Sequence, residues 1–410
     1  MSNIAIISKS DSTGGGASRI AASLARLLND LPEYEAHHWV GRPGINADWF
    51  TYKLHGGQWL SLIQGVCAIG SRTIGLPDFL TPELFIHLQR KSVNYDLYHF
   101  HDISFTFSPI ALKWLAMRKP IIWTMHDCSP FTGGCIAPLD CQAVYSGCNK
   151  CPQLNKLPLG TKIDFTGAMQ NFKIKLLGDY PIVIIVPSQW LAKEAIKVVN
   201  FKVKPIVIPN FVDTAIFKPL DKNIVREILG LPKDRFIVLL TATNLSDKHK
   251  GNYYAVEALK QLKSKPLIIA IGKLDEHQNI FFKGLEVVTT GYIYNDQLLA
   301  QYYACANIFL YPTLADTFGC VAIEAMACGT PAIAFSTGGV PEIIDHDQNG
   351  WLVKPKDTQG LAAGLEIAIN EPLRLKSWGK NARLKAEKHF NRDLFINRHL
   401  ALYDKVLSKL

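Results

Sequence analysis

The sequence predicts an α/β protein with two doubly wound domains, each built around a parallel sheet. Short apolar runs alternate with helical patterns along almost the whole chain, and they form two series on either side of the segment 208–213. This alternation is typical of parallel strands covered by helices on both faces. The length of 410 residues agrees with two or three domains. A composition of 48% hydrophobic and 19% charged residues excludes disorder, collagen and a small disulfide scaffold.

Runs of Ile, Val and Leu mark the expected strands, because a strand buried on both faces of a parallel sheet needs apolar residues at consecutive positions. The first series comprises residues 4–7, 97–100, 121–124, 182–186 and 206–208. The second series comprises residues 236–240, 267–271, 287–289, 308–311 and 332–335. Helical patterns lie between the strands, for example at residues 18–28, 189–199, 253–262 and 296–305.

Pro209 and Asn210 mark the predicted domain boundary, because they close the first strand series with residues that interrupt regular structure. We expect an N-terminal domain over residues 1–210, with a cysteine-rich loop at 128–151. We expect a C-terminal domain over residues 211–390. The last residues, 391–410, are expected to form a helix that packs back toward the N-terminal domain.

The formal net charge is +9, and residues 1–210 contribute 20 − 14 = +6 of it. Such an excess suits an anionic partner, for example a membrane surface, nucleic acid or a phosphorylated substrate. Candidate membrane-facing residues are Arg72, Arg90, Lys91, Arg118 and Lys119. No run of 18 apolar residues occurs, and the run at 4–7 is too short for a signal peptide. The sequence therefore predicts a cytoplasmic protein, with docking at the inner face of the cytoplasmic membrane as a further expectation.

Three glycines, Gly14, Gly15 and Gly16, follow the first expected strand and precede a helix. Glycine lets the backbone approach a bound group closely, and a helix N-terminus presents free N–H groups to a phosphate. The segment lacks the GxGxxG spacing, and no acidic residue ends the second strand candidate, so a dinucleotide fingerprint is not supported. A plain tight turn is the alternative interpretation.

His126 follows the expected strand 121–124, at the edge of a parallel sheet where ligands bind. A neutral imidazole can bind or orient a substrate hydroxyl near pH 7. A structural loop histidine is the alternative. His99 and His101 also end a strand, and we interpret them as packing residues.

Two acids, Asp316 and Glu324, stand eight residues apart across a predicted strand–loop–helix junction. Phe318 and Gly319 then lie at the helix N-terminus, where backbone amides are free for a phosphate. Carboxylates accept hydrogen bonds from sugar hydroxyls. This segment is therefore suited to bind a nucleotide sugar, with one acid at each end of that ligand.

Basic residues occur in the segment 244–251, between a strand and a helix. Lys248 and Lys250 follow Asn244 here, and lysine is a mobile point charge suited to a pyrophosphate. An ordinary solvated loop is the alternative.

A formal Asp-x-Asp pair, Asp345 and Asp347, has the residue types that hold a divalent ion on a diphosphate. We interpret that pair as a solvated turn, because it precedes an Asn-Gly turn.

Four of the nine cysteines fall within 17 residues, at Cys135, Cys141, Cys148 and Cys151. Four thiolates are the ligand set of a tetrahedral structural zinc site, and the Cys-x2-Cys end of the cluster has a ligand-like spacing. A structural zinc would pin the loop beside His126. The alternative is a loop of reduced or partly disulfide-bonded cysteines.

In their order and spacing, six segments together resemble the family 4 retaining glycosyltransferases of GT-B fold, also described as glycosyl transferases group 1. The segments are 14–16, 124–127, 209–213, 250–251, 316–324 and 338–342, so the resemblance spans nearly the whole chain. It implies two Rossmann-like domains facing across a cleft, with the acceptor on the N-terminal and the donor on the C-terminal domain. The segment 124–154, with its cysteines, looks like a branch of bacterial exopolysaccharide or lipopolysaccharide synthesis.

The resemblance implies transfer of a sugar from a nucleotide-diphosphate sugar to a glycan or lipid-linked acceptor, with retention and without a required metal. It places His126 and Asp316 at the catalytic centre. It assigns donor binding to Gly14, Gly15, Gly16, Asn244, Lys248, Lys250, Phe318, Gly319 and Glu324. Two positions depart from the family pattern. Asp316 stands where Glu is usual, and Asn244 where Arg is frequent, so that Lys248 is a candidate for the second cation.

Two other function classes remain as alternatives. A nucleotide-sugar epimerase of the same fold would need no acceptor, so detection of transfer separates it from a transferase. A basic nucleic-acid-binding protein is indicated only by the net charge. The Lys and Arg residues are spread along the chain rather than clustered with aromatic residues, so we expect no nucleic-acid partner.

Overall fold

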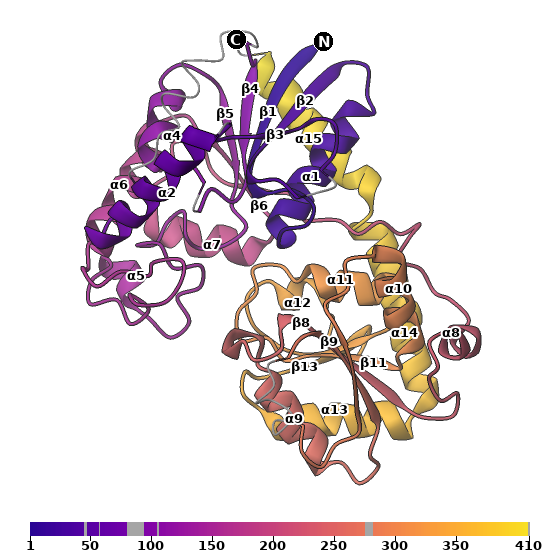
Figure 1. Ribbon diagram of the computed structural model, residues 1–410. Coiled ribbons are helices and arrows are strands. Elements are labelled where there is room, and N and C mark those ends of the chain that lie inside the picture. The colour runs from indigo at the N-terminus through magenta and orange to yellow at the C-terminus, as the bar shows by residue number, and fades with distance from the viewer. Residues whose placement is uncertain (45–46, 57, 80–93, 105, 275–281, 409–410) are drawn as a thin grey trace. The chain divides into compact units, whose positions relative to one another are not determined.

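The computed structural model describes residues 1–44, 47–56, 58–79, 94–104, 106–274 and 282–408 (Figure 1). The chain divides into two compact units: unit 1 is Met1–Ile208 with Ile396–Leu410, and unit 2 is Pro209–Phe395. Each unit is built on a parallel sheet with helices along it, which confirms the predicted fold class. Two of the basic residues expected to face a membrane, Arg90 and Lys91, lie outside the described residues.

Unit 1 contains a seven-stranded sheet in the order β3-β2-β1-β4-β5-β6-β7. Neighbouring strands pair in parallel, for example Ile4 opposite Leu97 and Phe100 opposite Trp123. The strands are β1 Ser2–Ser10, β2 Tyr34–Arg42, β3 Thr51–Lys53, β4 Leu97–Phe100, β5 Ile121–Thr124, β6 Val183–Val186 and β7 Ile206–Val207. The central strands β4 and β5 are buried at every position, as their apolar runs predict.

The helices of unit 1 follow the strands in the alternating pattern of a doubly wound fold. They are α1 Gly16–Asn29, α2 Gln58–Thr73, α4 Pro109–Ala116, α5 Ala143–Ser146, α6 Thr166–Asp179 and α7 Gln189–Val198. Helix α1 packs on the sheet through an apolar stripe with helical spacing, formed by Ile20, Leu24 and Leu28.

The C-terminal helix α15, Arg392–Leu407, belongs to unit 1 from residue 396 onward and runs along its sheet (Figure 1). Two side chains connect the helix to the strands. The Tyr403 hydroxyl is buried and lies 2.5 Å from His99 Nδ1. The Tyr34 hydroxyl donates a hydrogen bond of 2.9 Å to Asp404. Helix α15 thus contributes buried side chains to the N-terminal unit.

Unit 2 contains a six-stranded sheet in the order β10-β9-β8-β11-β12-β13. Its strands are β8 Ile237–Asn244, β9 Leu267–Lys273, β10 Val287–Gly291, β11 Ile308–Tyr311, β12 Ala332–Phe335 and β13 Gly350–Val353. Consecutive residues of β8 enter different cores, since Leu239 packs in one apolar cluster and Val238 and Leu240 pack in the other. The sheet is therefore covered on both faces.

The helices of unit 2 supply the covering layers of its two cores. They are α8 Lys222–Ile228, α9 Asn252–Gln261, α10 Asp296–Cys305, α11 Cys320–Ala327, α12 Val340–Ile343, α13 Thr358–Asn370 and α14 Pro372–His389, with a 3-10 turn η1 at Lys248–Lys250. In the described part of the chain, no helix of either unit is long and apolar enough to cross a membrane.

Candidate functional site

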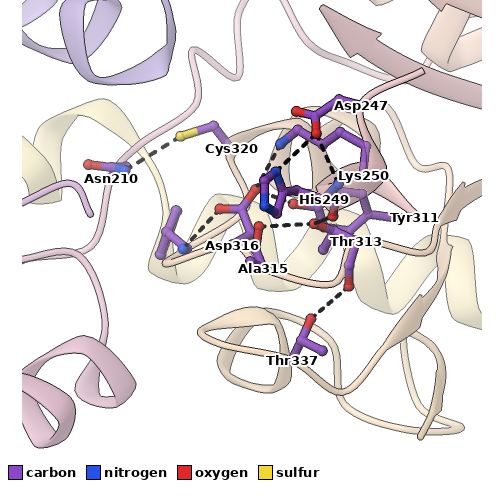
Figure 2. Close-up of polar contacts among 11 residues, drawn as sticks. Asn210, Asp247, His249, Lys250, Tyr311, Thr313, Ala315, Asp316, Cys320 and Thr337 are labelled. Carbon is purple, nitrogen blue, oxygen red and sulfur yellow. Dashed lines mark hydrogen bonds and ion pairs between the residues drawn. The ribbon is translucent and has the colours of Figure 1, made fainter. Parts of the chain in front are cut away.

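Asp316 lies in the loop that follows β11, at the carboxyl edge of the unit 2 sheet (Figure 2). Tyr311, the last residue of β11, donates its hydroxyl hydrogen to Asp316 Oδ2 at 2.5 Å. The Phe318 backbone N–H donates to Asp316 Oδ1 at 3.2 Å. Burial and the neighbouring carboxylate raise the pKa of Tyr311 well above its ordinary value. Two donors therefore set the orientation of this carboxylate before any ligand arrives.

Lys250 brings a positive charge to the same place. Its Nζ atom lies 3.6 Å from Asp316 Oδ2, and the two side chains keep 34% and 21% of their surface exposed. The 3-10 turn η1 that carries Lys250 begins after Asp247, whose side chain accepts a hydrogen bond of 2.9 Å from the His249 amide. The cation and the acid thus share a partly open site.

Gly251 permits the close approach of the η1 loop to the loop after β11. It has φ +65°, which favours glycine, and a Cβ atom there would lie 1.9 Å from the Pro312 carbonyl oxygen. Next to this contact, the Leu314 amide donates to the His249 carbonyl at 2.8 Å. The two loops are therefore joined backbone to backbone.

A third loop, after β12, joins the other two. The Thr337 hydroxyl donates to the Thr313 carbonyl at 2.9 Å (Figure 2). The Gly339 amide donates to the Asp316 carbonyl at 3.0 Å. Gly338 has φ +55°, and a Cβ atom there would lie 1.8 Å from the Asp316 carbonyl oxygen. The Gly-Gly pair found in the sequence therefore supports the Asp316 loop.

Glu324 lies inside α11 and is only 9% exposed. The buried Tyr303 hydroxyl of α10 donates to Glu324 Oε2 at 3.1 Å. Helix α11 begins at Cys320, and Gly319 precedes it with φ +105° and without a side-chain cap. Phe318 is buried. An uncapped helix N-terminus beside a lysine has the donors and the charge that a phosphate group needs.

Asn244 is the last residue of β8 and Lys248 is the first residue of η1, and both are exposed. The Asn244 side chain accepts a hydrogen bond of 2.9 Å from the Ser246 amide, which makes it a turn former. Lys250, and not Lys248, forms the ion pair with Asp316. The structure thus brings Lys250, Asp316, Phe318 and Gly319 together, with Asn244 and Lys248 at the start of the same loop.

The three glycines of unit 1 lie where β1 leads into α1, and Gly15 is the residue before the helix. A Cβ atom on Gly14 would lie 2.7 Å from the Ser10 Cβ atom. A Cβ atom on Gly15 or Gly16 would meet no atom within 4 Å. Packing within the unit therefore requires glycine at position 14 and leaves the other two positions open.

His126 follows β5 and is hydrogen-bonded to a second histidine. Its Nε2 atom lies 2.9 Å from His101 Nδ1, with the rings stacked at 5.1 Å between centroids. Burial, with a smaller contribution from His399, lowers the pKa of His126 to about 3, so the ring is neutral near pH 7. The interpretation of His101 as a packing residue is incomplete, because its ring contacts His126 directly. His99 is buried between Thr124 and Tyr403.

The four clustered cysteines line one small cavity in unit 1, and each has a free thiol. Within the described part of the chain, no group of three or more His, Cys, Asp or Glu side chains is arranged to hold a metal ion.

The Asp345 and Asp347 pair behaves as a structural turn. Asp345 pairs with Lys385 at 2.9 Å and Asp347 with Arg374 at 2.7 Å.

Two tyrosines of the site are absent from the sequence-based predictions. Tyr311 and Tyr303 each donate a hydrogen bond to one of the two acids. Tyr311 is the last residue of a correctly expected strand, directly before the Asp316 loop, so its hydroxyl was a usable signal. Tyr303 lies inside a helix among apolar residues, and its sequence position gives no such signal.

Two family models match the chain. "Glycosyltransferase Family 4" matches residues 14–216 and "Glycosyl transferases group 1" matches residues 221–385. Among curated relatives, the sulfoquinovosyl transferase SQD2 of Arabidopsis thaliana is 32% identical over 34% of this chain, and the match spans 30% of the relative's own length. An uncharacterized glycosyltransferase of Methanocaldococcus jannaschii is 25% identical over 75% of this chain and 77% of its own length.

Solved structures with the same architecture can be aligned with nearly the whole chain. A sucrose-phosphate synthase from Thermosynechococcus elongatus matches with a TM-score of 0.75 and 21% identity, covering all of both chains. HepE of Anabaena, solved in complex with UDP and glucose, matches with a TM-score of 0.71 and 18% identity, covering 99% of this chain and 100% of its own. At these identities, the likeness establishes the fold.

Both sheets are parallel, as expected, the two family models cover the two units in turn, and the structural neighbours share the fold from end to end. The chain therefore belongs to the group 1 and family 4 glycosyltransferases of GT-B fold.

Proposed function

We propose that this protein transfers a sugar from a nucleotide-diphosphate sugar to a glycan or lipid-linked acceptor, with retention of configuration, in the synthesis of a cell-surface polysaccharide. The observation that carries the proposal is the Lys250 ammonium 3.6 Å from the Asp316 carboxylate, next to the N-terminus of α11. A cation and a row of amides beside an acid suit a diphosphate attached to a sugar.

Departure of the nucleoside diphosphate adds negative charge to its phosphate oxygens. Lys250 and the first amides of α11 stabilise that charge as it develops, without reorganising, because hydrogen bonds between the loops already hold them. This electrostatic stabilisation is the main catalytic contribution that we assign to unit 2. The proposal assigns no covalent bond to Asp316.

Asp316 and Glu324 hold the two ends of the donor in this proposal. An ionised carboxylate has about four acceptor positions. Tyr311 and the Phe318 amide each donate to Asp316, one to each of its oxygens, and Tyr303 donates to Glu324. Acceptor capacity therefore remains on Asp316 for a sugar hydroxyl. Glu324, farther along α11, is assigned to the ribose.

A uridine diphosphate sugar is the first donor to test, because HepE of Anabaena was solved with UDP and glucose.

His126 is assigned to a substrate hydroxyl on unit 1. Its depressed pKa leaves a neutral imidazole, which has one donor and one acceptor nitrogen, and Nε2 is bonded to His101. We assign the glycines 14–16 to the same substrate, since Gly15 and Gly16 leave the entrance of α1 uncovered.

The decisive experiment supplies the purified protein with a panel of nucleotide-diphosphate sugars and a set of glycan and polyprenyl-linked acceptors. We expect release of the nucleoside diphosphate only with acceptor present, and a product whose anomeric configuration, read by NMR, equals that of the donor. An altered sugar formed without any acceptor would instead identify the epimerase. An inverted product would contradict the retaining assignment.

Substitution of Lys250 tests the diphosphate contact. Lys250→Ala should lower kcat by at least tenfold and leave the melting temperature near that of the wild type, because its ion pair is partly exposed and contributes only about 0–1 kcal/mol to stability. Lys248→Ala, an exposed lysine of the same turn, is the matched control and should lower kcat less. Equal activity of Lys250→Ala and wild type would remove Lys250 from the site.

Substitution of Glu324 tests donor binding. Glu324→Gln keeps an oxygen for the Tyr303 hydroxyl but removes the charge, and loss of one charge-assisted hydrogen bond costs roughly 1.5–3 kcal/mol. The Kd for the donor should therefore rise roughly 10- to 100-fold by calorimetry. Glu257→Gln, on the exposed face of α9, is the control and should bind the donor normally. A folded Glu324→Gln protein with unchanged Kd would contradict the assignment.

Docking on an anionic membrane from the cytoplasmic side is part of the proposal, because a lipid-linked acceptor lies there. Of the basic candidates, Arg118 stacks on Trp114, and Lys119 bonds to Asn94 and the Tyr95 carbonyl. The exposed apolar side of α2 offers a further means of attachment. It is formed by Trp59, Leu62, Ile63, Val66 and Ile69.

Vesicle flotation tests this docking. We expect the protein to float with vesicles rich in phosphatidylglycerol at low salt and to detach in part at high salt, because salt screens charge and leaves apolar contacts. Trp59→Ser should weaken binding, while Trp49→Ser, which removes an equally exposed tryptophan outside α2, should not. A protein that stays with the aqueous fraction at low salt does not dock on this surface.

A further inference from the structure

The cysteine-rich loop after β5 contains a feature that sugar transfer does not require. Cys135, Cys141, Cys148 and Cys151 all line one small cavity within unit 1, which we call the thiol cavity. Among the described residues of its wall there is no His, Asp or Glu. The groups with affinity for a metal that face this cavity are therefore thiols.

We propose that the thiol cavity binds one zinc ion through the thiolates of these four cysteines. Four sulfur ligands form the closed tetrahedral set of a structural zinc site, with no position left for a reacting water. Binding releases four thiol protons to solvent, forms four zinc–sulfur bonds and changes no oxidation state. The role of the ion is to cross-link the loop.

The backbone is already held at the first two cysteines. The Thr132 hydroxyl donates to the Cys135 carbonyl at 2.9 Å, and the Cys141 amide donates to the Pro138 carbonyl at 3.1 Å. At the start of the loop, the Cys128 amide donates to a carbonyl eight residues later, which closes the chain into a turn. These bonds position the first half of the loop without contribution from the sulfur atoms.

Helix α6 and the residues before it hold the other two cysteines. Gln170 Oε1 accepts a hydrogen bond of 2.6 Å from the Cys148 amide, and the Asp164 carboxylate accepts one of 2.7 Å from the Cys151 amide. The Gly133 amide donates to Cys148 Sγ at 3.3 Å, which links the two halves of the loop. Burial raises the pKa of the Cys148 thiol, and this hydrogen bond to its sulfur acts in the opposite direction.

The sulfur atoms must still converge, because no group of three or more ligating side chains in the described residues is arranged to hold a metal ion. Rotation about the Cα–Cβ bond moves a cysteine sulfur between staggered positions while the backbone stays in place. All four side chains already line the same cavity, and the hydrogen bonds that hold the loop end on backbone atoms of the cysteines, apart from the one to Cys148 Sγ. Convergence of the sulfur atoms can leave those backbone bonds intact.

Lys173 of α6 supplies a compensating positive charge beside the loop. It is 6% exposed, and its Nζ atom donates to the Ser129 carbonyl at 2.6 Å. Burial lowers the pKa of Lys173 to about 8, while Cys135 and Cys148 act in the opposite direction. Zinc with four thiolates is a dianion, and a nearby buried cation offsets part of the cost of removing it from water.

Elemental analysis of the full-length protein, purified with a reductant and without chelator, should find about one zinc per chain. After metal removal, added Co²⁺ should give an intense thiolate-to-cobalt absorption band. Chelation should lower the melting temperature, and added zinc should restore it. Protein without zinc, protein with iron in its place, or a melting temperature that does not respond to chelation would overturn the proposal.

Two further measurements locate the metal. Cys148→Ser should lose the bound zinc, while Cys67→Ser, a substitution in α2 outside the loop, should retain it. If Cys148→Ser fails to fold, the cobalt spectrum of the wild type still shows whether thiolates bind the metal. Alkylation of the denatured, unreduced protein should modify all nine cysteines. A disulfide among the four loop cysteines would show that they pair with each other instead of binding metal.

Discussion

The arrangement of the candidate-site residues in unit 2 depends on one close backbone contact, between the loop after β8 and the loop after β11. Gly251 permits it, because a Cβ atom there would lie 1.9 Å from the Pro312 carbonyl oxygen. The ion pair between Lys250 and Asp316 cannot be the cause of the contact, since a partly exposed pair contributes only about 0–1 kcal/mol. The loops meet through backbone packing and hydrogen bonds, and the charges come together as a result.

Burial determines how much of the fold can be predicted from the sequence. Strands that are buried on both faces contain continuous apolar runs, and all ten of the expected runs overlap strands. The undetected strands β2, β3 and β13 lie at or beside sheet edges. Within β2, His37 and His38 break the apolar pattern, although His38 is fully buried and hydrogen-bonded to the Ser8 hydroxyl at 2.8 Å. A polar residue satisfied by tertiary structure is invisible to a hydropathy pattern.

Some residues of the candidate site can likewise be predicted from the local sequence, and others cannot. The spacing of Asp316 and Glu324, and the place of Lys250 before a glycine, are properties of local sequence and could be found there. The contact between Lys250 and Asp316 could not be found there, because it depends on a 3-10 turn that ends against a distant loop. Tyr303 was missed for the same reason: its partner is Glu324 on another helix. Residues that orient a carboxylate are identified only once the elements are packed.

In both units, irregular chain lies at the carboxyl edge of a parallel sheet and is held there by tertiary contacts. In unit 2, glycines bring three loops into backbone contact. In unit 1, the loop 128–151 contains only the short helix α5 and needs support from the elements around it. Side chains of α6 provide it, since Gln170 bonds to the Phe131 and Val144 carbonyls and Lys173 to the Ser129 carbonyl. Because the loop begins directly after His126 and Asp127, its support by α6 also limits the movement of the chain that carries the His126 ring.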